Sequence, residues 1–280
     1  MRELDAVLIT ETVARLCAEA NTALSADVTA ALARAAAAEE SPAGREVLRQ
    51  LVENARLAAC DADPICQDTG LAVVWVDLGQ DVHIRGGGLC EAIDEGVRRG
   101  YRDACLRASV VGHPLRRVNT GDNTPAMIHV RLVPGEALTL TVAPKGAGSE
   151  NMSALAMLRP ADGRAGVIEF VVGVVERAGA KACPPLVVGV GIGGTMELAA
   201  LLAKRALLRP LGETHADPVT AELEAELLRR INDTGIGPQG FGGRCTALAV
   251  ACETAPCHIA SLPVAVNLNC HAARHATATI

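Results

Sequence analysis

Apolar positions recur every three or four residues through the first part of the chain, which predicts helices there. The spacing is clear at 7–16 and continues in alanine-rich segments at 28–38 and 44–59. Pro42 separates the second segment from the third and suits the start of a new helix. We therefore predict a helical N-terminal region that ends near residue 58.

After this region, short apolar runs alternate with further helical spacing. Apolar or alternating runs predict strands at 71–78, 127–133, 137–142, 186–191, 245–252 and 263–268. Helical spacing returns at about 89–107, 150–158, 163–179, 195–208 and 217–232. Pro134 and Gly135, between the second and third strands, are typical of a hairpin turn.

This order of elements bears on the fold class. A hairpin beside a single strand–loop–helix unit predicts an α+β (mixed α/β) fold rather than a doubly wound parallel sheet. We expect the helical region at 1–58 to be followed by a mixed sheet-and-helix domain at 59–280. No repeat or low-complexity linker separates them, so we expect one continuous structural unit.

Composition limits how the core is built and what the protein can bind. Half of the 280 residues are hydrophobic, but only one Trp, one Tyr and two Phe are among them. The core must therefore consist of Ala, Val, Leu and Ile, with helices packed closely together. A net charge of −6 offers no basic surface for nucleic acid or an anionic membrane. Acidic residues near the N-terminus and the lack of an apolar stretch of ~18 residues predict a soluble, cytoplasmic protein.

Ten cysteines in a chain without a secretory signal indicate a reducing compartment, and hence thiols or metal ligands rather than disulfides. No C-x-x-C pair occurs, so neither a zinc ribbon nor a thioredoxin-like site is supported. Several cysteines lie in apolar or helical runs and are best interpreted as small buried hydrophobic residues. These are Cys17, Cys90, Cys105, Cys245 and Cys252.

Three cysteines have less usual surroundings. Cys66 lies in a loop bounded by proline and glycine, next to Gln67 and Asp68, so that a thiol, an amide and a carboxylate share one turn. Cys183 precedes two prolines, and Cys270 lies between an asparagine and a histidine. Their separation in the sequence cannot show whether they meet. If they do, three thiolates on a [4Fe–4S] cluster leave one iron without a protein ligand, and that iron can act as a Lewis acid.

The glycines at 189–194 fit the pattern G-x-G-x-x-G between a predicted strand and a predicted helix. A dinucleotide site also needs an acidic residue at the end of a second parallel strand about 20 residues later, and no strand is predicted there. Two alternatives stay open. The glycines can expose N–H groups at the helix start to an anion or a cluster, or they can allow close packing.

Three further features have both an ordinary and a functional interpretation. The loop at 145–151 (KGAGSEN) lacks the order of a phosphate-binding loop, but its amides could bind a carboxylate. Arg107 ends a predicted helix, where an arginine usually remains solvated near the helix dipole. His258 adjoins an apolar segment, where a single histidine is usually part of the core.

Taken in order, these segments resemble the α-chain of class I, iron–sulfur-dependent fumarate hydratase, in the fumarase and tartrate dehydratase group. The resemblance covers about residues 60–275. The matching segments are ICQDTG (65–70), LRAS (106–109), NTGDNTPA (119–126), KGAGSEN (145–151), CPP (183–185), GVGIGG (189–194), GPQG (237–240) and the stretch at 258–270. Eight ordered segments are far more specific than any one of them.

The resemblance implies an activity, a cofactor and a set of site residues. It implies reversible hydration of fumarate to malate, with a [4Fe–4S] cluster held by Cys66, Cys183 and Cys270. It also implies substrate contacts from Gln67, Asp68, Arg107 and the loop from Gly146 to Gly148, with His258 at the site. A charge-assisted bond from Arg107 to a carboxylate is physically sensible. Asp68 would repel a carboxylate, so we expect it to act on the hydroxyl or the transferred water, without assigning it as acid or base.

The chain departs from the family pattern in two ways. Fused members of the family continue into a second, swivelling domain, whereas this chain ends ten residues after Cys270. We therefore expect a separate β-subunit to complete the site, in an α2β2 or larger assembly, and the chain alone to be nearly inactive. The second departure is His271, which stands where small residues are more common.

Two alternatives to a fumarase remain. Tartrate dehydratase belongs to the same group, and its substrate is also a C4 dicarboxylate. Segments at 148–151, 193–197 and 269–275 resemble fumarase-type α-chains, which favours fumarate. The other alternative is a non-enzymatic iron–sulfur sensor or scaffold. A sensor needs cysteines but no dicarboxylate pocket, so the presence of Gln67, Asp68, Arg107 and His258 together argues against it.

Overall fold

The computed structural model describes residues 2–280, which divide into two compact units. The first unit contains residues up to Ser25, then Ala55–Ala147 and Arg274–Ile280. The second contains Ala26–Asn54 and Gly148–Ala273. The units therefore do not divide at residue 58, because each takes segments from both sides of that position.

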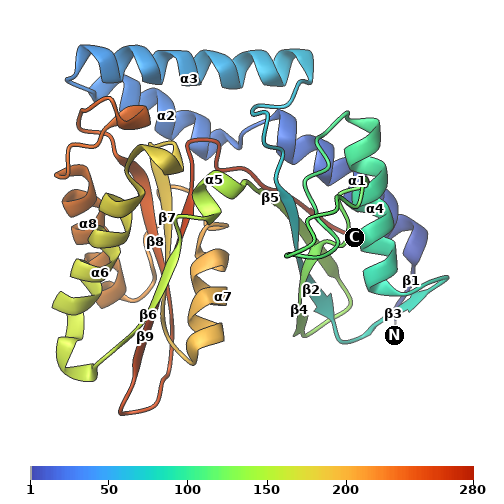
Figure 1. The fold of residues 1–280 in the computed structure, drawn as a ribbon. Coiled ribbons are helices and arrows are strands. Elements are labelled where there is room, and N and C mark those ends of the chain that lie inside the picture. The colour runs from blue at the N-terminus through green and yellow to red at the C-terminus, as the bar shows by residue number, and fades with distance from the viewer. Residues whose placement is uncertain (1) are drawn as a thin grey trace. The chain divides into compact units, whose positions relative to one another are not determined.

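The first unit is built on a four-stranded sheet in the order β10-β5-β2-β4. Figure 1 labels β2, β4 and β5 of this sheet. Its strands are β2 (Leu71–Gly79), β4 (Met127–Val133), β5 (Leu138–Lys145) and β10 (Ala276–Thr279). Two short strands, β1 (Arg2–Asp5) and β3 (Val82–Arg85), form a separate parallel pair. Helices α1 (Ala6–Thr22) and α4 (Leu89–Asp103) belong to this unit.

The predicted hairpin between β4 and β5 is wrong. Both strands exist near their expected positions, but β2 lies between them, parallel to β4 and antiparallel to β5. Pro134-Gly135 is therefore part of a connection that crosses the end of β2. The apolar run of β2 is best buried in the centre of the sheet, where both of its edges are paired.

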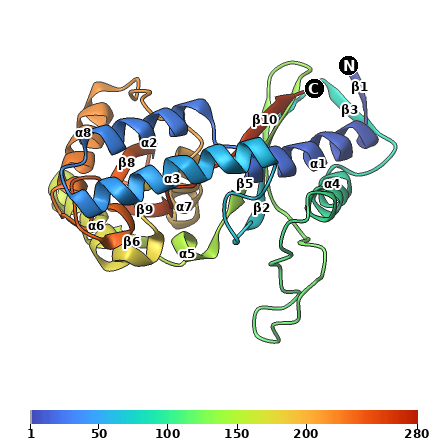
Figure 2. The same ribbon diagram turned by 90° about the horizontal axis from the view of Figure 1, so that it is seen from above.

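Glycines allow the two helices of the first unit to pack closely, as the low aromatic content predicts. α1 and α4 lie side by side (Figure 2). A Cβ atom on Gly96 would lie 2.7 Å from the carbonyl oxygen of Thr10, and one on Gly100 would lie 2.6 Å from that of Ala14. The core below them consists of aliphatic side chains from both helices and one face of the sheet. On the other face, the rings of Trp75 and His129 have centroids 4.5 Å apart.

The second unit is built on a four-stranded sheet in the order β6-β9-β7-β8. Its strands are β6 (Ala154–Leu158), β7 (Leu186–Gly193), β8 (Ala247–Ala255) and β9 (Leu262–Asn269). Its helices are α2 (Ala26–Ala38), α6 (Gly163–Ala178), α7 (Met196–Ala206) and α8 (Pro218–Asn232). The short helix α5 (Ala147–Glu150) begins at the last residue of a first-unit segment and continues into the second unit. Helix α3 (Pro42–Asp61) has residues in both units. The strand pattern of β6 contradicts the helix predicted at 150–158.

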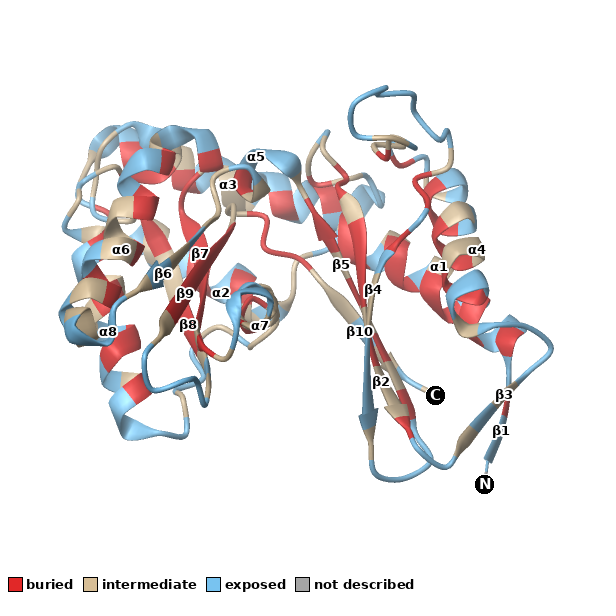
Figure 3. Ribbon diagram, turned by 60° about the horizontal axis from the view of Figure 1, so that its bottom comes forward, coloured by how far each residue is buried: buried red, intermediate tan, exposed pale blue. Residues whose placement is uncertain are grey.

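The glycine motif at 189–194 serves close packing of a helix on a strand. A Cβ atom on Gly189 would lie 2.1 Å from the carbonyl oxygen of Ala203, and one on Gly191 would lie 2.0 Å from that of Ala199. Both acceptors are in α7, so α7 packs directly on the backbone of β7. The alternate residues of β7 pack against α6 and α8 in the main core of this unit. Strands β7 and β9 are accordingly buried along most of their length (Figure 3).

Glu39 joins the segment between α2 and α3 to the loop before β8. Its carboxylate accepts hydrogen bonds from the backbone N–H groups of Glu40, Ser41, Arg244 and Cys245. Burial raises the pKa of this carboxyl, but the four donors outweigh burial, and the pKa lies below its ordinary value. These bonds explain why residues 26–54 belong to the second unit.

The mixture of helices with parallel and antiparallel strands confirms the α+β prediction. No helix within residues 2–280 is both long and apolar enough to cross a membrane.

Candidate functional site

The loop that carries Cys66 follows α3 in the first unit and is held by hydrogen bonds to its own side chains. The Cys66 sulfur accepts the backbone N–H of Asp68 at 3.4 Å and lies 3.4 Å from Oε1 of Gln67. Gln67 is exposed, whereas Cys66 and Asp68 are half-buried. The thiol, the amide and the carboxylate predicted from the sequence therefore meet in one turn.

Asp68 connects this turn to the predicted glycine loop. Its Oδ1 accepts the N–H of Gly70 at 3.0 Å, and its Oδ2 accepts the N–H of Ala147 at 2.9 Å. A Cβ atom on Gly146 would lie 3.2 Å from the same Oδ2, so a larger residue there would crowd the carboxylate. The structure thus brings together Asp68 and Gly146. Gly148 belongs to the second unit.

Thr69 fixes the backbone of Arg107 beside the same turn. The Thr69 hydroxyl accepts the N–H of Arg107 at 2.9 Å and donates to its carbonyl oxygen at 3.2 Å. Thr69 is buried, but the Arg107 side chain is exposed, and no ion pair of its guanidinium occurs among residues 2–280. The guanidinium is therefore available to an anion from outside the chain.

A second arginine lies next to the turn. Arg274, only 5% exposed, donates from Nη2 to the carbonyl oxygen of Asp68, and its Nη1 has no hydrogen-bond partner within the described part of the chain. The hydroxyl of Tyr101 donates to the carbonyl oxygens of Thr69 and Gly70, at 2.8 and 3.2 Å. Burial raises the pKa of Tyr101, so its hydroxyl remains a donor at ordinary pH.

Cys183 and Cys270 lie at one edge of the sheet in the second unit. Cys183 precedes β7, and Cys270 directly follows β9, which is antiparallel to β7 with Val187 opposite Asn269. The N–H of His271 donates to the carbonyl oxygen of Cys183 at 3.2 Å, so the two cysteine segments are adjacent. Both cysteines are half-buried, and neither forms a disulfide.

His258 lies at the other edge of that sheet. It is exposed in the connection between the end of β8 and the start of β9. Strand β7 has eight residues, and at ~3.3 Å per residue it spans about 26 Å. The structure therefore does not bring His258 near Cys183 and Cys270 of the same chain. It lines an apolar cavity of about 470 Å³ beside the first turns of α6 and α8.

The remaining cysteines divide by burial. Cys17 and Cys252 are buried as predicted, and burial raises the pKa of both thiols, that of Cys17 to about 12. Cys245 is half-buried, with its pKa raised to about 12, first by burial and then by the nearby Glu39 carboxylate. The prediction is wrong for Cys90 and Cys105, which are exposed at the two ends of α4. Helical spacing alone does not identify the face that a terminal residue presents.

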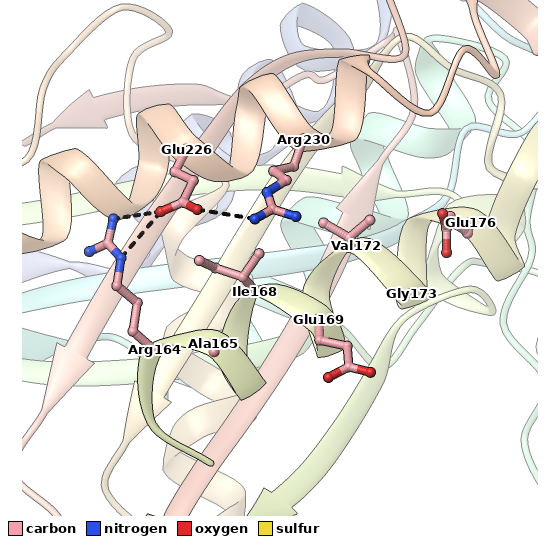
Figure 4. Close-up of a pocket in the computed structure, with 9 residues that line it drawn as sticks. All are labelled: Arg164, Ala165, Ile168, Glu169, Val172, Gly173, Glu176, Glu226 and Arg230. Atoms are coloured by element: carbon pink, nitrogen blue, oxygen red, sulfur yellow. Dashed lines mark hydrogen bonds and ion pairs between the residues drawn. The ribbon is translucent and has the colours of Figure 1, made fainter.

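A cavity of about 650 Å³ involves none of the predicted site residues (Figure 4). It lies between α6 and α8, and both of its arginines pair with the same carboxylate. Glu226 contacts Arg164 at 3.0 Å and Arg230 at 3.7 Å.

The sulfur atoms of the three candidate cysteines are the type of ligand that an iron–sulfur cluster requires. Thiolates are the usual ligands of iron–sulfur clusters, and Cys183 and Cys270 are adjacent and not fully buried. Within residues 2–280, no group of three or more His, Cys, Asp or Glu side chains is arranged to hold a metal ion. The three cysteines are divided between the units, with Cys66 in the first.

Several residues that organise these segments are not evident from the sequence pattern. Thr69, Arg274 and Gln239 each act through a hydrogen bond to a backbone group far away in the sequence. Gln239 is adjacent to a glycine motif, which is a weak signal. Arg274 follows Cys270 by four positions and is the one Arg, Lys, Asp or Glu in residues 262–280, which is a stronger signal.

Comparison with known proteins gives a consistent result. A family model described as fumarate hydratase (Fumerase) matches residues 10–279. A Methanocaldococcus jannaschii protein, described provisionally as L(+)-tartrate dehydratase subunit alpha, is 44% identical over 275 residues, or 96% of each chain. The L(+)-tartrate dehydratase subunit alpha of Escherichia coli strain UTI89 is 34% identical over 273 residues, covering 96% of this chain and 89% of that one.

Proposed function

This chain belongs to the fumarate hydratase family, a family of hydro-lyases, and from that premise we propose that it is the α-subunit of an iron–sulfur enzyme that hydrates fumarate to malate. One observation carries the proposal. Pairing of β7 with β9 places Cys183 and Cys270, 87 positions apart in the sequence, at the same sheet edge. Cysteines in adjacent segments that are neither disulfide-bonded nor fully buried suit a cluster.

In this proposal Cys66, Cys183 and Cys270 hold a [4Fe–4S] cluster. When bound, the cluster supplies an iron without a protein thiolate that serves as a Lewis acid toward the substrate. The chain's own residues supply the setting for that group. The turn at Cys66 presents a thiol and an amide together, and its shape depends on the bonds made by Asp68 and Thr69.

Substrate binding in this proposal depends on Arg107, Gln67 and the glycine loop. The Arg107 guanidinium is exposed and suits a charge-assisted bond to a carboxylate. Gln67 offers an exposed amide, and the N–H groups at Gly146 and Gly148 are further donors. Asp68 uses both carboxylate oxygens to hold the loop, so its contribution is to position these donors as well as to contact the hydroxyl or water.

Arg274 supports the proposal that an anion occupies this region. A buried guanidinium without an ion pair is costly, and the cost falls when an anion lies nearby. The substrate carries two carboxylates, and the cluster with its thiolates is also anionic. Either would stabilise the charge of Arg274.

Fumarate and L(+)-tartrate are both candidate substrates. We keep fumarate first because the matching family model is described as fumarate hydratase and covers nearly the whole chain. L(+)-tartrate is the second candidate because the two relatives described above carry that name. Both acids have two carboxylates on a four-carbon chain, so the residues proposed for binding suit either.

The relatives are named as alpha subunits, which supports a requirement for a β-subunit. The exposed guanidinium of Arg107 can pair with one carboxylate, whereas the substrate carries two. We expect the β-subunit to supply further cationic groups and the α-chain to be nearly inactive without it.

His258 can belong to the proposed site only through another copy of the chain, because it lies about 26 Å from the cysteine edge of its own sheet. This part of the proposal has its own test. A Cys183→Ser chain and a His258→Asn chain, each inactive alone, should regain activity when mixed with the β-subunit. Absence of complementation would remove His258 from the site.

The proposed function is tested with reconstituted α- and β-subunits under nitrogen. Loss of fumarate absorbance and dehydration of L(+)-tartrate are followed in parallel, with each subunit alone as the control. Faster turnover of L(+)-tartrate would reverse the order of the two substrates. No turnover of either acid, with the cluster intact and the β-subunit present, would favour the sensor or scaffold.

A further inference from the structure

The segment that carries Cys183 has few ways to be held in place. Pro184 and Pro185 follow it, and proline has no backbone N–H, so this stretch cannot donate hydrogen bonds to a neighbouring strand. It is anchored by the N–H of Cys183, which donates to the carbonyl oxygen of Ala180 at 3.0 Å, and by its own carbonyl groups. The position of the Cys183 sulfur therefore depends in part on donors that approach the carbonyl groups of Cys183 and Pro184 from elsewhere in the chain.

Two residues supply those donors. Gln239 approaches the carbonyl oxygen of Pro184 twice, with its backbone N–H at 2.8 Å and its side-chain Nε2 at 2.7 Å. His271 approaches the carbonyl oxygen of Cys183 twice, with its backbone N–H at 3.2 Å and its ring Nδ1 at 3.3 Å. The two side chains also meet, with 3.2 Å between Nε2 of Gln239 and Nδ1 of His271.

The backbone around Gln239 is shaped to make this contact. Gln239 has a φ of 51°, in the left-handed region, inside a short turn between Pro238 and Gly240. A Cβ atom on Gly240 would lie 2.5 Å from Cβ of Ala180, so the turn packs directly against the segment that leads to Cys183. A residue in this strained region next to a candidate ligand is a candidate for function.

The tautomer of His271 decides which of the ring contacts is a hydrogen bond, and both tautomers hold the segment. With the proton on Nδ1, the ring donates directly to the carbonyl oxygen of Cys183. With the proton on Nε2, Nδ1 accepts from Gln239, whose other N–H bonds the carbonyl oxygen of Pro184. Since His271 directly follows Cys270, either arrangement joins the two cysteine segments.

We propose that Gln239 and His271 are positioning residues that fix the spacing of Cys183 and Cys270, so that both thiolates are set to receive the cluster. This inference rests on the proposed function, because it takes both cysteines as cluster ligands. Residues that orient metal ligands commonly change metal affinity or activity by 10–100-fold when they are replaced. The arrangement also accounts for His271, which the family pattern leaves unexplained.

The test uses the full-length chain reconstituted anaerobically with iron and sulfide. In Gln239→Ala and His271→Ala, iron should pass to a ferrous chelator about 10–100-fold faster than in the unchanged chain, with an altered electron paramagnetic resonance line shape. His271→Asn should restore most of the loss, because the asparagine amide places a polar atom where Nδ1 lies. The control is His215→Ala, since His215 is remote from both cysteines in sequence and its ring accepts the N–H of Asp217 at 3.0 Å.

A second readout does not require the cluster. In the apo chain, alkylation of Cys183 and Cys270 should become faster in Gln239→Ala and His271→Ala, whereas the rate at Cys66 should not change. Unchanged iron release and alkylation in both variants would overturn the inference. Normal iron content in Cys183→Ser would instead overturn the proposed cluster ligands, so the two failures can be told apart.

Discussion

The two segments that carry the candidate ligands are held by different kinds of bond. In the first unit, the Cys66 turn depends on side chains, with Asp68 and Thr69 each making two hydrogen bonds to backbone groups. In the second unit, Cys183 and Cys270 lie at the ends of paired strands, whose ladder is made by backbone groups alone. The Gln239–His271 contacts add side-chain bonds to that ladder.

This difference indicates where each segment is vulnerable. A backbone ladder survives most side-chain substitutions, because its donors and acceptors are the same in every residue. A turn held by two side chains loses its shape when either is removed. We therefore expect many single substitutions to disturb the Cys66 turn. In the second unit, we expect the segments of Cys183 and Cys270 to be disturbed mainly by replacing these cysteines, Gln239 or His271.

The largest effect should come from the ligands, and it should be equal in the two units. Cys66→Ser, Cys183→Ser and Cys270→Ser should each abolish uptake of a [4Fe–4S] cluster, because a three-thiolate site cannot lose a ligand. Iron and sulfide analysis after anaerobic reconstitution measures this. Cys105→Ser, an exposed cysteine outside both segments, is the control and should keep normal iron. Normal iron in the Cys66 variant would show that the first unit is not needed for the cluster.

Arg107→Ala separates substrate binding from cluster binding. With the β-subunit present, it should lower kcat/KM. The loss of transition-state stabilisation calculated from that ratio should be ~2–5 kcal/mol, the scale for removing one partner of a charge pair that is buried once the substrate is bound. Its iron content should stay normal, since Thr69 holds only the Arg107 backbone. Arg116→Ala, another arginine of this unit, is the control. An unchanged kcat/KM in Arg107→Ala would remove this residue from the site.

Glu39 is the exception in the second unit, because a single side chain there accepts four backbone N–H groups. Glu39→Gln should lower the free energy of unfolding by ~1.5–3 kcal/mol at pH 7, the scale for hydrogen bonds to a charged group. Because the folded pKa is lowered, this stabilisation is present above the unfolded pKa of ~4.3 and is lost as the pH falls through the folded value. Denaturant unfolding at pH 7 and pH 3 should show the difference between the two chains shrink.

The control for this prediction is the adjacent Glu40. Its carboxylate is exposed and pairs with Arg244 at 3.3 Å, so Glu40→Gln should change stability by less than ~1 kcal/mol. Equal losses in the two variants would mean that the buried hydrogen bonds of Glu39 add nothing beyond charge.

The smallest expected effect concerns the Cys66 turn itself. Thr69→Val keeps the shape of the side chain but removes its hydroxyl, and it should cost ~1 kcal/mol of unfolding free energy. Alkylation of Cys66 in the apo chain should become faster, because the turn loses its link to Arg107. Thr220→Val, which removes a buried hydroxyl in the second unit, is the matched control. It should cost similar stability without changing the rate at Cys66.

Most helices and the central strands could be predicted from the sequence, because β2 and β7 are long apolar runs and the helices have regular spacing. The order of the strands could not, since β2 enters between β4 and β5 through pairings that no local turn signal records. The glycines before α7 illustrate the same limit. Close packing and anion binding require the same residue type, and only the position of α7 against β7 distinguishes them.

The candidate site could be predicted only in part, because some of it depends on long-range strand pairing. The turn at Cys66 is local, so its chemistry could be read from neighbouring residues. The adjacency of Cys183 and Cys270 depends on the antiparallel pairing of β7 with β9, and the remoteness of His258 depends on the same pairing. Arg274 and Gln239 act on backbone groups, which no side-chain pattern reveals.

The single tryptophan of the chain gives the first unit an optical signal of its own. Trp75 lies on β2 against the ring of His129, and the second unit has no tryptophan. Indole fluorescence therefore reports unfolding of the first unit alone, whereas far-ultraviolet circular dichroism reports the helices of both. Two superimposable melting curves would mean that the units unfold cooperatively, and two separate ones would order their stabilities without any added label.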